Sequence, residues 1–272
     1  MSMRSLLAVA AALAATLAAE AAESFGYATW NVGHFSLGLK NLPSIAPADA
    51  SAKAGEYRMF LSEAGVSVLG TCEHSTAFTS DKSLKSADTA FADFPGCAYV
   101  PLSSGHANAV MWKGDVTLVD SGYHNFPVRN AKCYCQWARL RVRGREVCFV
   151  EAHCDWNTMD AGHEFDRVEQ MRFLARTFGK EPRVVISGDF NSCVRNRVTG
   201  KWTDAFKEFE IFRQAGFDAA HWGELKTWPA SGPYLGIDNI FTKGLAISDV
   251  RAQRDKTLSD HSLLRCTLTF KE

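Results

Sequence analysis

The chain has 272 residues, of which 46% are hydrophobic and 22% are charged, and its formal net charge is zero. These values are typical of a globular protein and exclude a disordered or collagen-like chain. Because nucleic-acid-binding proteins are usually strongly basic, the balanced charge gives no global indication of such a partner. No linker-like segment or internal repeat divides the sequence. We therefore expect one domain, and we expect it to be monomeric.

The N-terminal segment has the pattern of a secretory signal peptide. Arg4 supplies a positive charge, Ser5–Ala19 is an uncharged run rich in alanine and leucine, and small residues near Ala21 offer a cleavage site. The alternative is a membrane anchor, but a spanning helix needs about 20 strongly apolar residues, and this run is shorter. We expect residues 1–22 to be removed and no transmembrane segment to remain. Residues 23–272 would then form a periplasmic or extracellular catalytic domain.

Short apolar runs bounded by turn residues predict strands along the rest of the chain. These strands cover residues 27–32, 66–69, 109–112, 116–119, 137–142, 147–153, 184–187, 237–241 and 263–270. Helices are predicted, partly from apolar residues at helical spacing, over residues 51–64, 164–178 and 203–215. Strands and helices intermix without strict alternation. This order favours a layered α/β fold with mixed sheets over a parallel barrel.

Polar residues recur at the ends of these strands, where a rigid scaffold commonly places functional groups. The segments are Trp30-Asn31, Glu73, Glu151-Ala152-His153, Gly188-Asp189-Phe190-Asn191, Ile237-Asp238 and Ser259-Asp260-His261. Each segment alone is weak evidence, because a strand-end glutamate is often solvated and Gly, Asp and Asn all favour turns. Asp238 is harder to dismiss, since an acid within an apolar strand is costly to bury without a partner.

Taken in order, this set resembles the endonuclease/exonuclease/phosphatase superfamily, which includes pancreatic-type deoxyribonucleases, apurinic endonucleases, neutral sphingomyelinases and inositol-polyphosphate phosphatases. Gly-Asp-Phe-Asn and Ser-Asp-His are its most specific elements. The resemblance implies a four-layer α/β sandwich of two mixed β-sheets flanked by helices. It also implies a metal-dependent hydrolase of phosphodiester or phosphomonoester bonds. Two positions depart from the family pattern: Cys72 stands where Gln is common and Ala152 where Thr is common.

A divalent cation is expected, because a phosphate ester is anionic and its oxygens must be neutralised before attack. Glu73 is the principal ligand candidate, as the resemblance also implies. Asn31 offers an amide oxygen and Asp260 a second carboxylate. Mg²⁺ is the expected cation, with Mn²⁺ and Ca²⁺ as alternatives. Because a magnesium site usually keeps several waters, a short list of protein ligands is expected.

The attacking water needs a base, and two side chains are candidates. His261 titrates near working pH, whereas the family commonly uses the aspartate of Gly-Asp-Phe-Asn, here Asp189, to orient the water. Both assignments stay open. Asn191 can donate its amide to a developing oxyanion. The resemblance implies that Asp238 binds the second ring nitrogen of His261, and His153 is left for phosphate contact or leaving-group protonation.

The substrate is open at this level. A nuclease needs a cationic track for the phosphate backbone, and Arg195, Arg197 and Lys201 follow the Gly-Asp-Phe-Asn motif. Asn157, shortly after His153, is a further substrate-binding candidate. For all four residues a solvated loop is the alternative. The partner is therefore a phosphate ester, with nucleic acid among the candidates. The competing interpretation is a non-catalytic phosphate-ligand binding protein on the same fold, but every polar position of the site is filled with a competent residue.

Eight cysteines in an exported chain allow disulfides. A turn over residues 143–146 would set Cys135 opposite Cys154. Opposed Cβ atoms lie roughly 4.5–5.5 Å apart, near the roughly 3.5–4.5 Å of a disulfide. A Cys135–Cys154 bridge is therefore a hypothesis. A different turn length would break this register, Cys133 could compete, and the thiols could all stay reduced.

Overall fold

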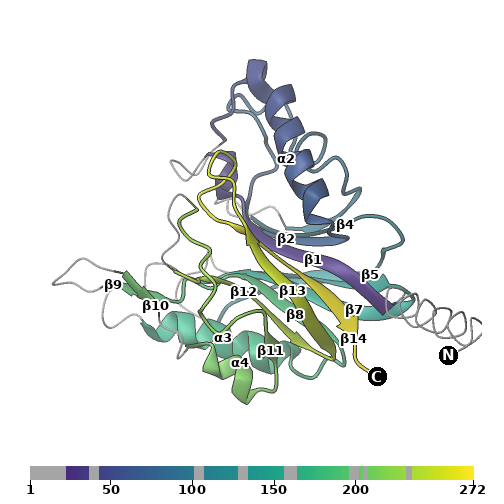
Figure 1. The fold of residues 1–272 in the computed structure, drawn as a ribbon, viewed down its shortest axis with the longest axis vertical. Helices are drawn as coiled ribbons and strands as arrows, with labels where there is room; N and C mark the ends of the chain where they lie inside the picture. Colours follow the sequence, from purple (N-terminus) through teal and green to yellow (C-terminus); the bar gives the residue numbers. More distant parts are fainter. Residues whose placement is uncertain are drawn as a thin grey trace, which may run out of the picture.

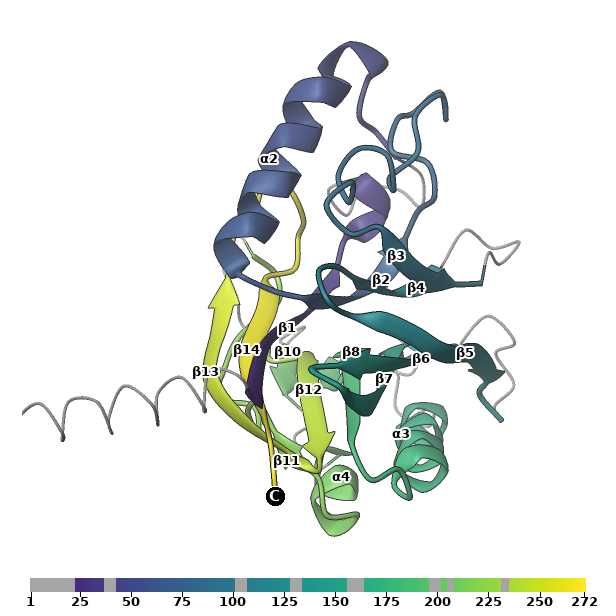
Figure 2. The ribbon, with the colours of Figure 1, turned by 90° about the vertical axis from the view of Figure 1, so that its right-hand side faces the viewer.

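The computed structural model describes residues 23–36, 43–100, 107–127, 134–155, 164–195, 202–204, 208–230 and 235–272. These residues form two six-stranded β-sheets that face each other (Figure 1). Figure 2 shows helix α2 outside one sheet and helices α3 and α4 outside the other. None of the described helices is both long and apolar enough to cross a membrane.

The first sheet has the strand order β13-β14-β1-β2-β4-β3. Its strands are Leu245–Gln253 (β13), Leu263–Phe270 (β14), Ser24–Asn31 (β1), Val68–His74 (β2), Ala107–Trp112 (β4) and Gly96–Tyr99 (β3). Strands β1 and β2 are parallel, and the other neighbours are antiparallel. A parallel pair needs a long crossover. Here it contains the short helices η1 (Gly33–Phe35) and η2 (Pro47–Asp49) and helix α2 (Ala50–Ala64).

The second sheet has the order β11-β12-β8-β7-β6-β5. Its strands are Asp218–Ala219 (β11), Asp238–Lys243 (β12), Val184–Asp189 (β8), Arg145–His153 (β7), Tyr134–Val142 (β6) and Thr117–Asn125 (β5). The parallel pair here is β7–β8, and its crossover contains helix α3 (Glu164–Phe178). Strands β9 (Cys193–Arg195) and β10 (Trp202–Asp204) form a separate ribbon, and α4 (Glu210–Gln214) is a short helix.

Three apolar clusters separate four layers. One lies between α2 and the first sheet, where the rings of Trp30 and Tyr57 have centroids 5.6 Å apart. A second fills the space between the two sheets, where Phe25 meets Phe149 at 6.1 Å. The third packs α3 and α4 onto the second sheet. Burial of these faces is the main favourable term in folding. The four-layer sandwich predicted from the resemblance is confirmed.

Every predicted strand is present, although the one predicted over residues 116–119 extends to Asn125 as β5. Helices α2 and α3 lie where helices were predicted, the second of them from the helical spacing of its apolar residues. The predicted helix 203–215 is wrong at its start, because residues 202–204 pair as β10 with β9 and the helix is confined to Glu210–Gln214. Strands β3, β9, β11 and β13 were not predicted. β13 is an edge strand whose side chains, except Leu245, are exposed or half-buried, so it lacks a long apolar run for a sequence pattern to detect.

The turn between β6 and β7 is shorter than the sequence analysis assumed. Arg143 and Gly144 have φ of 52° and 79°, which is typical of a two-residue hairpin turn with the twist that flanking strands favour. Val142 therefore pairs with Arg145. The predicted register had placed Val142 opposite Val147, which shifts every pair along the hairpin by two residues.

The shorter turn rules out the predicted disulfide. Cys135 lies opposite Ala152 rather than Cys154. Neither Cys135 nor Cys154 is joined in a disulfide, and the same holds for the other cysteines among the described residues. The hypothesis of a Cys135–Cys154 bridge is therefore wrong. Its competitor Cys133 lies outside the described residues, as does the predicted signal peptide.

Candidate active site

Six strands present their ends at one edge of the facing sheets. The parallel pairs β1–β2 and β7–β8 bring their carboxyl ends there, and the antiparallel strands β12 and β14 begin there. Residues predicted for the site lie at these ends or directly beyond them, and each is connected to another of the set by a contact or by its charge. They are Asn31, Glu73, His153, Asp189, Asn191, Asp238, Asp260 and His261.

Asn31 joins the two sheets at this edge. Its Nδ2 donates to Asp189 Oδ2 at 3.0 Å across the sheets. The same amide nitrogen lies 3.3 Å from Glu73 Oε1 on the neighbouring strand. Its Oδ1 accepts the backbone N–H of Gly33 at 3.0 Å. The side chain is therefore held from both ends, with one lone pair of Oδ1 still available.

Glu73 is turned into the site by an irregularity in β2. The pairing of β2 with β4 shifts register between Thr71 and His74, and such bulges re-aim side chains. Glu73 itself has a φ of 48°, a strained conformation for a residue with a Cβ. The bulge thus breaks the regular alternation of side chains along β2 and directs the Glu73 carboxylate toward the other sheet.

Histidines surround the Glu73 carboxylate. His34 Nε2 lies 3.3 Å from Oε2, and His153 Nε2 lies 4.0 Å from Oε1. Burial alone would raise the pKa of Glu73, but the charges of His153, His34 and His261 outweigh it, so the pKa is lowered. Glu73 is therefore an ionised oxygen donor. His34 was not predicted as a site residue, and its only signal in the sequence is its position three residues beyond Asn31.

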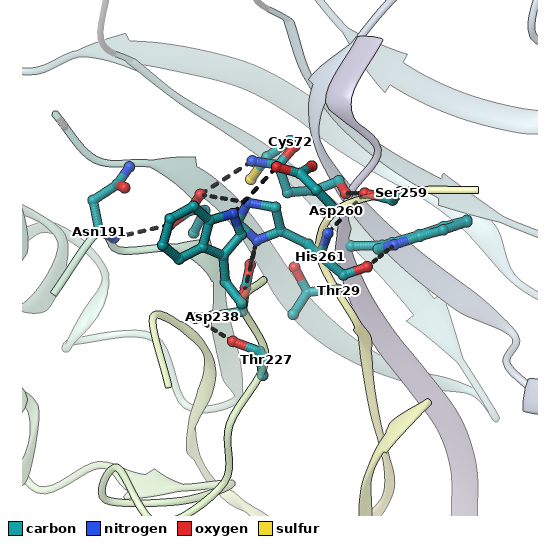
Figure 3. Close-up of polar contacts among 12 residues, drawn as sticks. Thr29, Cys72, Asn191, Thr227, Asp238, Ser259, Asp260 and His261 are labelled. Carbon is teal, nitrogen blue, oxygen red and sulfur yellow. Dashed lines mark hydrogen bonds and ion pairs between the residues drawn. The ribbon is translucent and has the colours of Figure 1, made fainter. Parts of the chain in front are cut away.

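His261 lies between the carboxylates of Asp238 and Asp189, and Figure 3 shows Asp238 next to its ring. Its Nδ1 is 3.0 and 3.1 Å from the two oxygens of Asp238, and its Nε2 is 3.7 Å from Asp189 Oδ2. Burial alone would lower the pKa of His261, but Asp238 and Asp189 raise it to about 10. The pairing with Asp238 that the resemblance implied is thus present, and the ring is held as an imidazolium.

The Ser-Asp-His segment is fixed to the end of β1 through its backbone. Ser259 Oγ donates to Asn31 O at 2.6 Å and accepts the N–H of His261 at 3.1 Å. Trp30 Nε1 donates to His261 O at 3.1 Å. These bonds hold the imidazole next to Asp189 without using its ring nitrogens. The hydroxyl in this motif therefore has a positioning role that depends on its bond to the first strand.

The Gly-Asp-Phe-Asn segment folds back on itself. Asp189 Oδ1 accepts the N–H of Asn191 at 2.9 Å, and Asn191 Nδ2 donates to Cys154 O at 2.9 Å. Gly188 has a φ of 132°, and a Cβ there would lie 1.9 Å from Ala152 O. Glycine is therefore required at 188. Because one oxygen of Asp189 is used locally, Oδ2 is the oxygen that faces the other site residues. Burial, together with the charge of Asp238, raises the pKa of Asp189.

A buried ion pair supports the residue that follows this segment. Arg167 on α3 donates through Nε and Nη2 to the two oxygens of Glu208 at 2.6 and 2.5 Å, the bidentate geometry that strengthens such pairs. Ser192 Oγ donates to Glu208 Oε2 at 3.0 Å. Sequence reasoning did not find this group, because its members are widely separated and carry no motif.

Within the part of the chain that the structure describes, two sets of side chains are candidates to hold a divalent cation. Asp189, Asp238 and His261 have ligand atoms within 4.8 Å of one another. Both ring nitrogens of His261, however, face carboxylates and carry protons, so they offer no lone pair to a metal. Glu73 has a side chain 25% exposed, against 3% for Asp189. Glu73 is therefore the better donor for Mg²⁺, which prefers oxygen. Asn31 turns its amide nitrogen toward Glu73 and its oxygen toward the N–H of Gly33.

The other predicted residues differ in how far the structure describes them. Asp260 Oδ2 accepts a hydrogen bond from Trp228 Nε1 at 3.2 Å, and the Trp228 ring lies 6.2 Å from that of His261. The backbone of Arg195 ends β9 opposite β10. Asn157 and Arg197 lie outside the described residues. A substrate-binding role for these last three residues stays a prediction.

The Endonuclease/Exonuclease/phosphatase family profile matches residues 28–261, which is most of the chain. The protein therefore belongs to this family, whose members are generally hydrolases acting on phosphoesters. No curated protein sequence matches the chain.

Solved structures are similar over nearly the whole chain. An endonuclease/exonuclease/phosphatase from Bacteroides vulgatus has a TM-score of 0.67 at 16% identity, covering 91% of this chain and 99% of that one. TDP2 from D. rerio, humanized by 14 mutations, has a TM-score of 0.65 at 15% identity, covering 91% and 99%. D. rerio TDP2 complexed with a single-strand DNA product has a TM-score of 0.64 at 14% identity, covering 90% and 99%. At these identities the likeness shows the fold.

Proposed function

We propose that this protein is a divalent-metal-dependent phosphoesterase that hydrolyses its substrate by attack of water. One observation carries the proposal: hydrogen-bond donors converge on a single oxygen, Asp189 Oδ2. Asn31 Nδ2 lies 3.0 Å from it. His153 Nε2 and His261 Nε2 lie 3.6 and 3.7 Å from it. A carboxylate and two imidazoles that face one point are the groups needed to deprotonate a water and to bind a phosphate.

Glu73 and Asn31 would hold the cation, for which Mg²⁺ is the first candidate and Mn²⁺ and Ca²⁺ are the alternatives. The fit rests on Glu73, which is an ionised carboxylate. The amide oxygen of Asn31 accepts the N–H of Gly33 while its nitrogen faces Glu73, so Asn31 would join the donor set with its amide turned over. When bound, the cation supplies positive charge that offsets the phosphate oxygens and the charge developing on the leaving group. The remaining chemistry belongs to the side chains of the chain.

Asp189 accepts the proton of the attacking water at Oδ2, because its other oxygen is used by Asn191. His261 is the weaker candidate for this step, since Asp238 keeps its ring protonated. Its Nε2–H is instead available to donate to a phosphate oxygen. His153 has a side chain 17% exposed, more than that of His261, and it donates to the phosphate or protonates the leaving group.

Nucleic acid is the first substrate class to test. D. rerio TDP2, which shares the fold, was crystallised with a single-strand DNA product. In this chain the Trp228 ring lies beside His261, and an aromatic face next to the scissile phosphate can stack a base. Arg195, Arg197 and Asn157 are the candidate contacts to the rest of such a substrate. Phospholipid and sugar or inositol phosphates are the alternatives.

The deciding experiment is turnover of bis-p-nitrophenyl phosphate and single-stranded DNA with Mg²⁺, Mn²⁺ or Ca²⁺, each with and without EDTA. We expect hydrolysis that EDTA abolishes and that Asp189→Asn reduces strongly. Binding of these phosphates without turnover would favour the non-catalytic alternative. Absence of turnover across DNA, RNA, sphingomyelin and inositol phosphates would contradict the proposed enzyme.

Export is a separate part of the proposal and rests on the pattern of residues 1–22 alone. Mass spectrometry of the protein from the periplasm or medium should show a chain that begins near Ala22 or Glu23. Recovery of the intact chain from Met1 in that fraction would contradict cleavage.

A further inference from the structure

A buried carboxyl group lies directly beneath the proposed active site and has no part in the mechanism above. Glu151, on β7, is fully buried between the two sheets. It precedes His153 by two residues, so its side chain leaves the strand on the same face. Burying a carboxyl is costly unless its oxygens find partners, so its surroundings indicate what it does.

The partners of Glu151 are neutral donors on three other strands. Thr29 Oγ1 on β1 donates to Oε1 at 2.7 Å. Ser187 Oγ on β8 donates to Oε2 at 2.6 Å, and Cys72 Sγ on β2 lies 3.2 Å from Oε1. One carboxyl group therefore connects two strands of the first sheet with two strands of the second.

Each of these partners lies one or two residues before a residue of the proposed site. Thr29 precedes Asn31 by two residues, and Ser187 precedes Asp189 by two. Cys72 directly precedes Glu73. The hydrogen bonds of Glu151 thus form a polar layer one step below the layer that contains the candidate metal ligands and the candidate base.

The same cross-sheet pattern repeats along β1. Tyr27 bonds to Ser187, Thr29 bonds to Glu151, and the site contact between Asn31 and Asp189 continues the series. Successive residues on one face of a strand are about 6.6 Å apart, so the contacts follow one another at regular intervals. The contact between Asn31 and Asp189 is the last of this series, so the preceding contacts help to set the distance between the two sheets at the site.

The opposing strand leaves room for this carboxyl. Gly70 is paired with Thr29 on β1, and a Cβ at 70 would lie 2.0 Å from Glu151 Oε2. Burial raises the pKa of Glu151 to about 7, against the opposing effect of its hydroxyl and thiol donors. For stability alone, an apolar side chain of this size would be cheaper to bury. The presence of a carboxyl at position 151 is better explained by its role in connecting four strands.

We propose that Glu151 is a positioning residue, whose carboxyl fixes β1, β2 and β8 to β7 and thereby sets the placement of Asn31, Glu73 and Asp189 across the two sheets. This inference deepens the proposed function and rests on it only where activity is measured. It assigns Glu151 no contact with substrate or metal. It predicts that the geometry of the site depends on Glu151 more than on an equally buried neighbour.

The test compares three variants. Glu151→Ala deletes the carboxyl. Glu151→Gln keeps its shape and its bonds, because Ser187 can accept from the new amide and turn its own hydroxyl toward Val150 O, 3.4 Å away. Val147→Ala is the matched control. It removes a fully buried side chain from the same strand and the same inter-sheet cluster but touches none of the polar layer.

The first readout needs neither metal nor substrate. The imidazole resonances of His153 and His261 are recorded by NMR in the metal-free protein. We expect them to move in Glu151→Ala and to stay near wild-type positions in Glu151→Gln and Val147→Ala. The second readout is turnover of bis-p-nitrophenyl phosphate with Mg²⁺, where Glu151→Ala should lower kcat about 10- to 100-fold, as supporting residues of metal sites do, with a smaller change in KM.

Unmoved imidazole resonances in Glu151→Ala, or the same changes in Val147→Ala, would overturn the proposal, as would a Glu151→Gln variant as damaged as the alanine variant. If the wild type hydrolyses nothing, the proposed function fails while the NMR comparison still decides the role of Glu151. If Glu151→Ala does not fold, Thr29→Val and Ser187→Ala replace it, since each removes a single bond to the same carboxyl.

Discussion

Cys72 Sγ lies 3.2 Å from the carbonyl oxygen of Ala152. These are the two positions at which the sequence departs from the pattern of its family, and they are in direct contact across the two sheets. The residues that follow them are Glu73 and His153. The departures therefore form one packed pair beneath the site, and the thiol bonds to the strand that carries His153.

The first prediction concerns the candidate metal ligand. Glu73→Gln keeps the shape of the side chain but removes the charge that would hold the cation. We expect turnover to fall by more than about 100-fold, beyond the usual effect of a supporting residue, with partial recovery at high Mg²⁺. The measurement is kcat against Mg²⁺ concentration.

Glu146→Gln, at an exposed site on the β6–β7 hairpin, is the control and should behave like wild type. Undiminished turnover of Glu73→Gln at low Mg²⁺ would remove Glu73 as the ligand.

The second prediction concerns the charge on His261. Asp238→Asn should lower the pKa of His261, since Asp238 is the strongest of the influences that raise it to about 10. Because this pKa is higher in the folded state than in the unfolded state, protonation of His261 stabilises the fold. The stabilisation is complete below the unfolded pKa of 6.5 and is lost as the pH rises through about 10. The variant should therefore lose less stability than wild type between these two values.

The measurement for Asp238→Asn is an NMR titration of His261 combined with thermal unfolding across the same pH window. Glu146→Gln, at an exposed site on the β6–β7 hairpin, is again the control. An unchanged His261 titration in Asp238→Asn would show that Asp238 does not hold the proton.

Much of this site could be predicted from the sequence because its residues lie at strand ends. Asn31, Asp189 and Asp238 each border an apolar run, and a parallel or antiparallel pairing brings such ends to one edge. The sandwich followed from the same motifs. These predictions depend on local pattern and on residue type, which a single sequence contains.

Other parts depend on contacts between distant residues and have no local signature. His34 enters the site only because the chain takes a φ of 54° after β1. Arg167 and Glu208 are 41 residues apart. The hairpin register depends on a turn of two residues, and assuming four placed Cys135 opposite the wrong partner. In each case the missing information is geometry that only the packed structure supplies.

The third prediction uses the titration of Glu151. Burial raises its pKa from 4.5 to about 7, so the folded state holds a proton that the unfolded state releases. Stability associated with this proton is complete below pH 4.5 and is lost as the pH rises through about 7. The shift corresponds to about 3 kcal/mol.

Glu151→Gln has no titratable group at this position. The free energy of unfolding of wild type should therefore fall relative to that of Glu151→Gln as the pH rises from 5 to 8. Urea unfolding at both pH values measures the difference. Glu181→Gln is the control, because it alters a partly exposed acid that pairs with Arg139 on the opposite, helix-covered face of the same sheet. Parallel pH profiles of wild type and Glu151→Gln would contradict the raised pKa.

The last prediction tests whether Gly70 is required by Glu151. A Cβ at position 70 would lie 2.0 Å from Glu151 Oε2 and 2.9 Å from the hydroxyl oxygen of Tyr27. Gly70→Ala should therefore destabilise the wild type by about 1–3 kcal/mol, as overpacking a core does. In the Glu151→Ala background the carboxyl is gone and only the Tyr27 contact remains, so the cost should fall to less than half. The two changes would then be non-additive, as expected for neighbours.

Gly26→Ala is the control, because its Cβ would meet the backbone oxygen of Gly65 at 2.3 Å, a clash that deleting the carboxyl cannot relieve. Urea unfolding of the four proteins in each cycle gives the coupling energies. Equal costs of Gly70→Ala in both backgrounds would show that the glycine is needed for another reason.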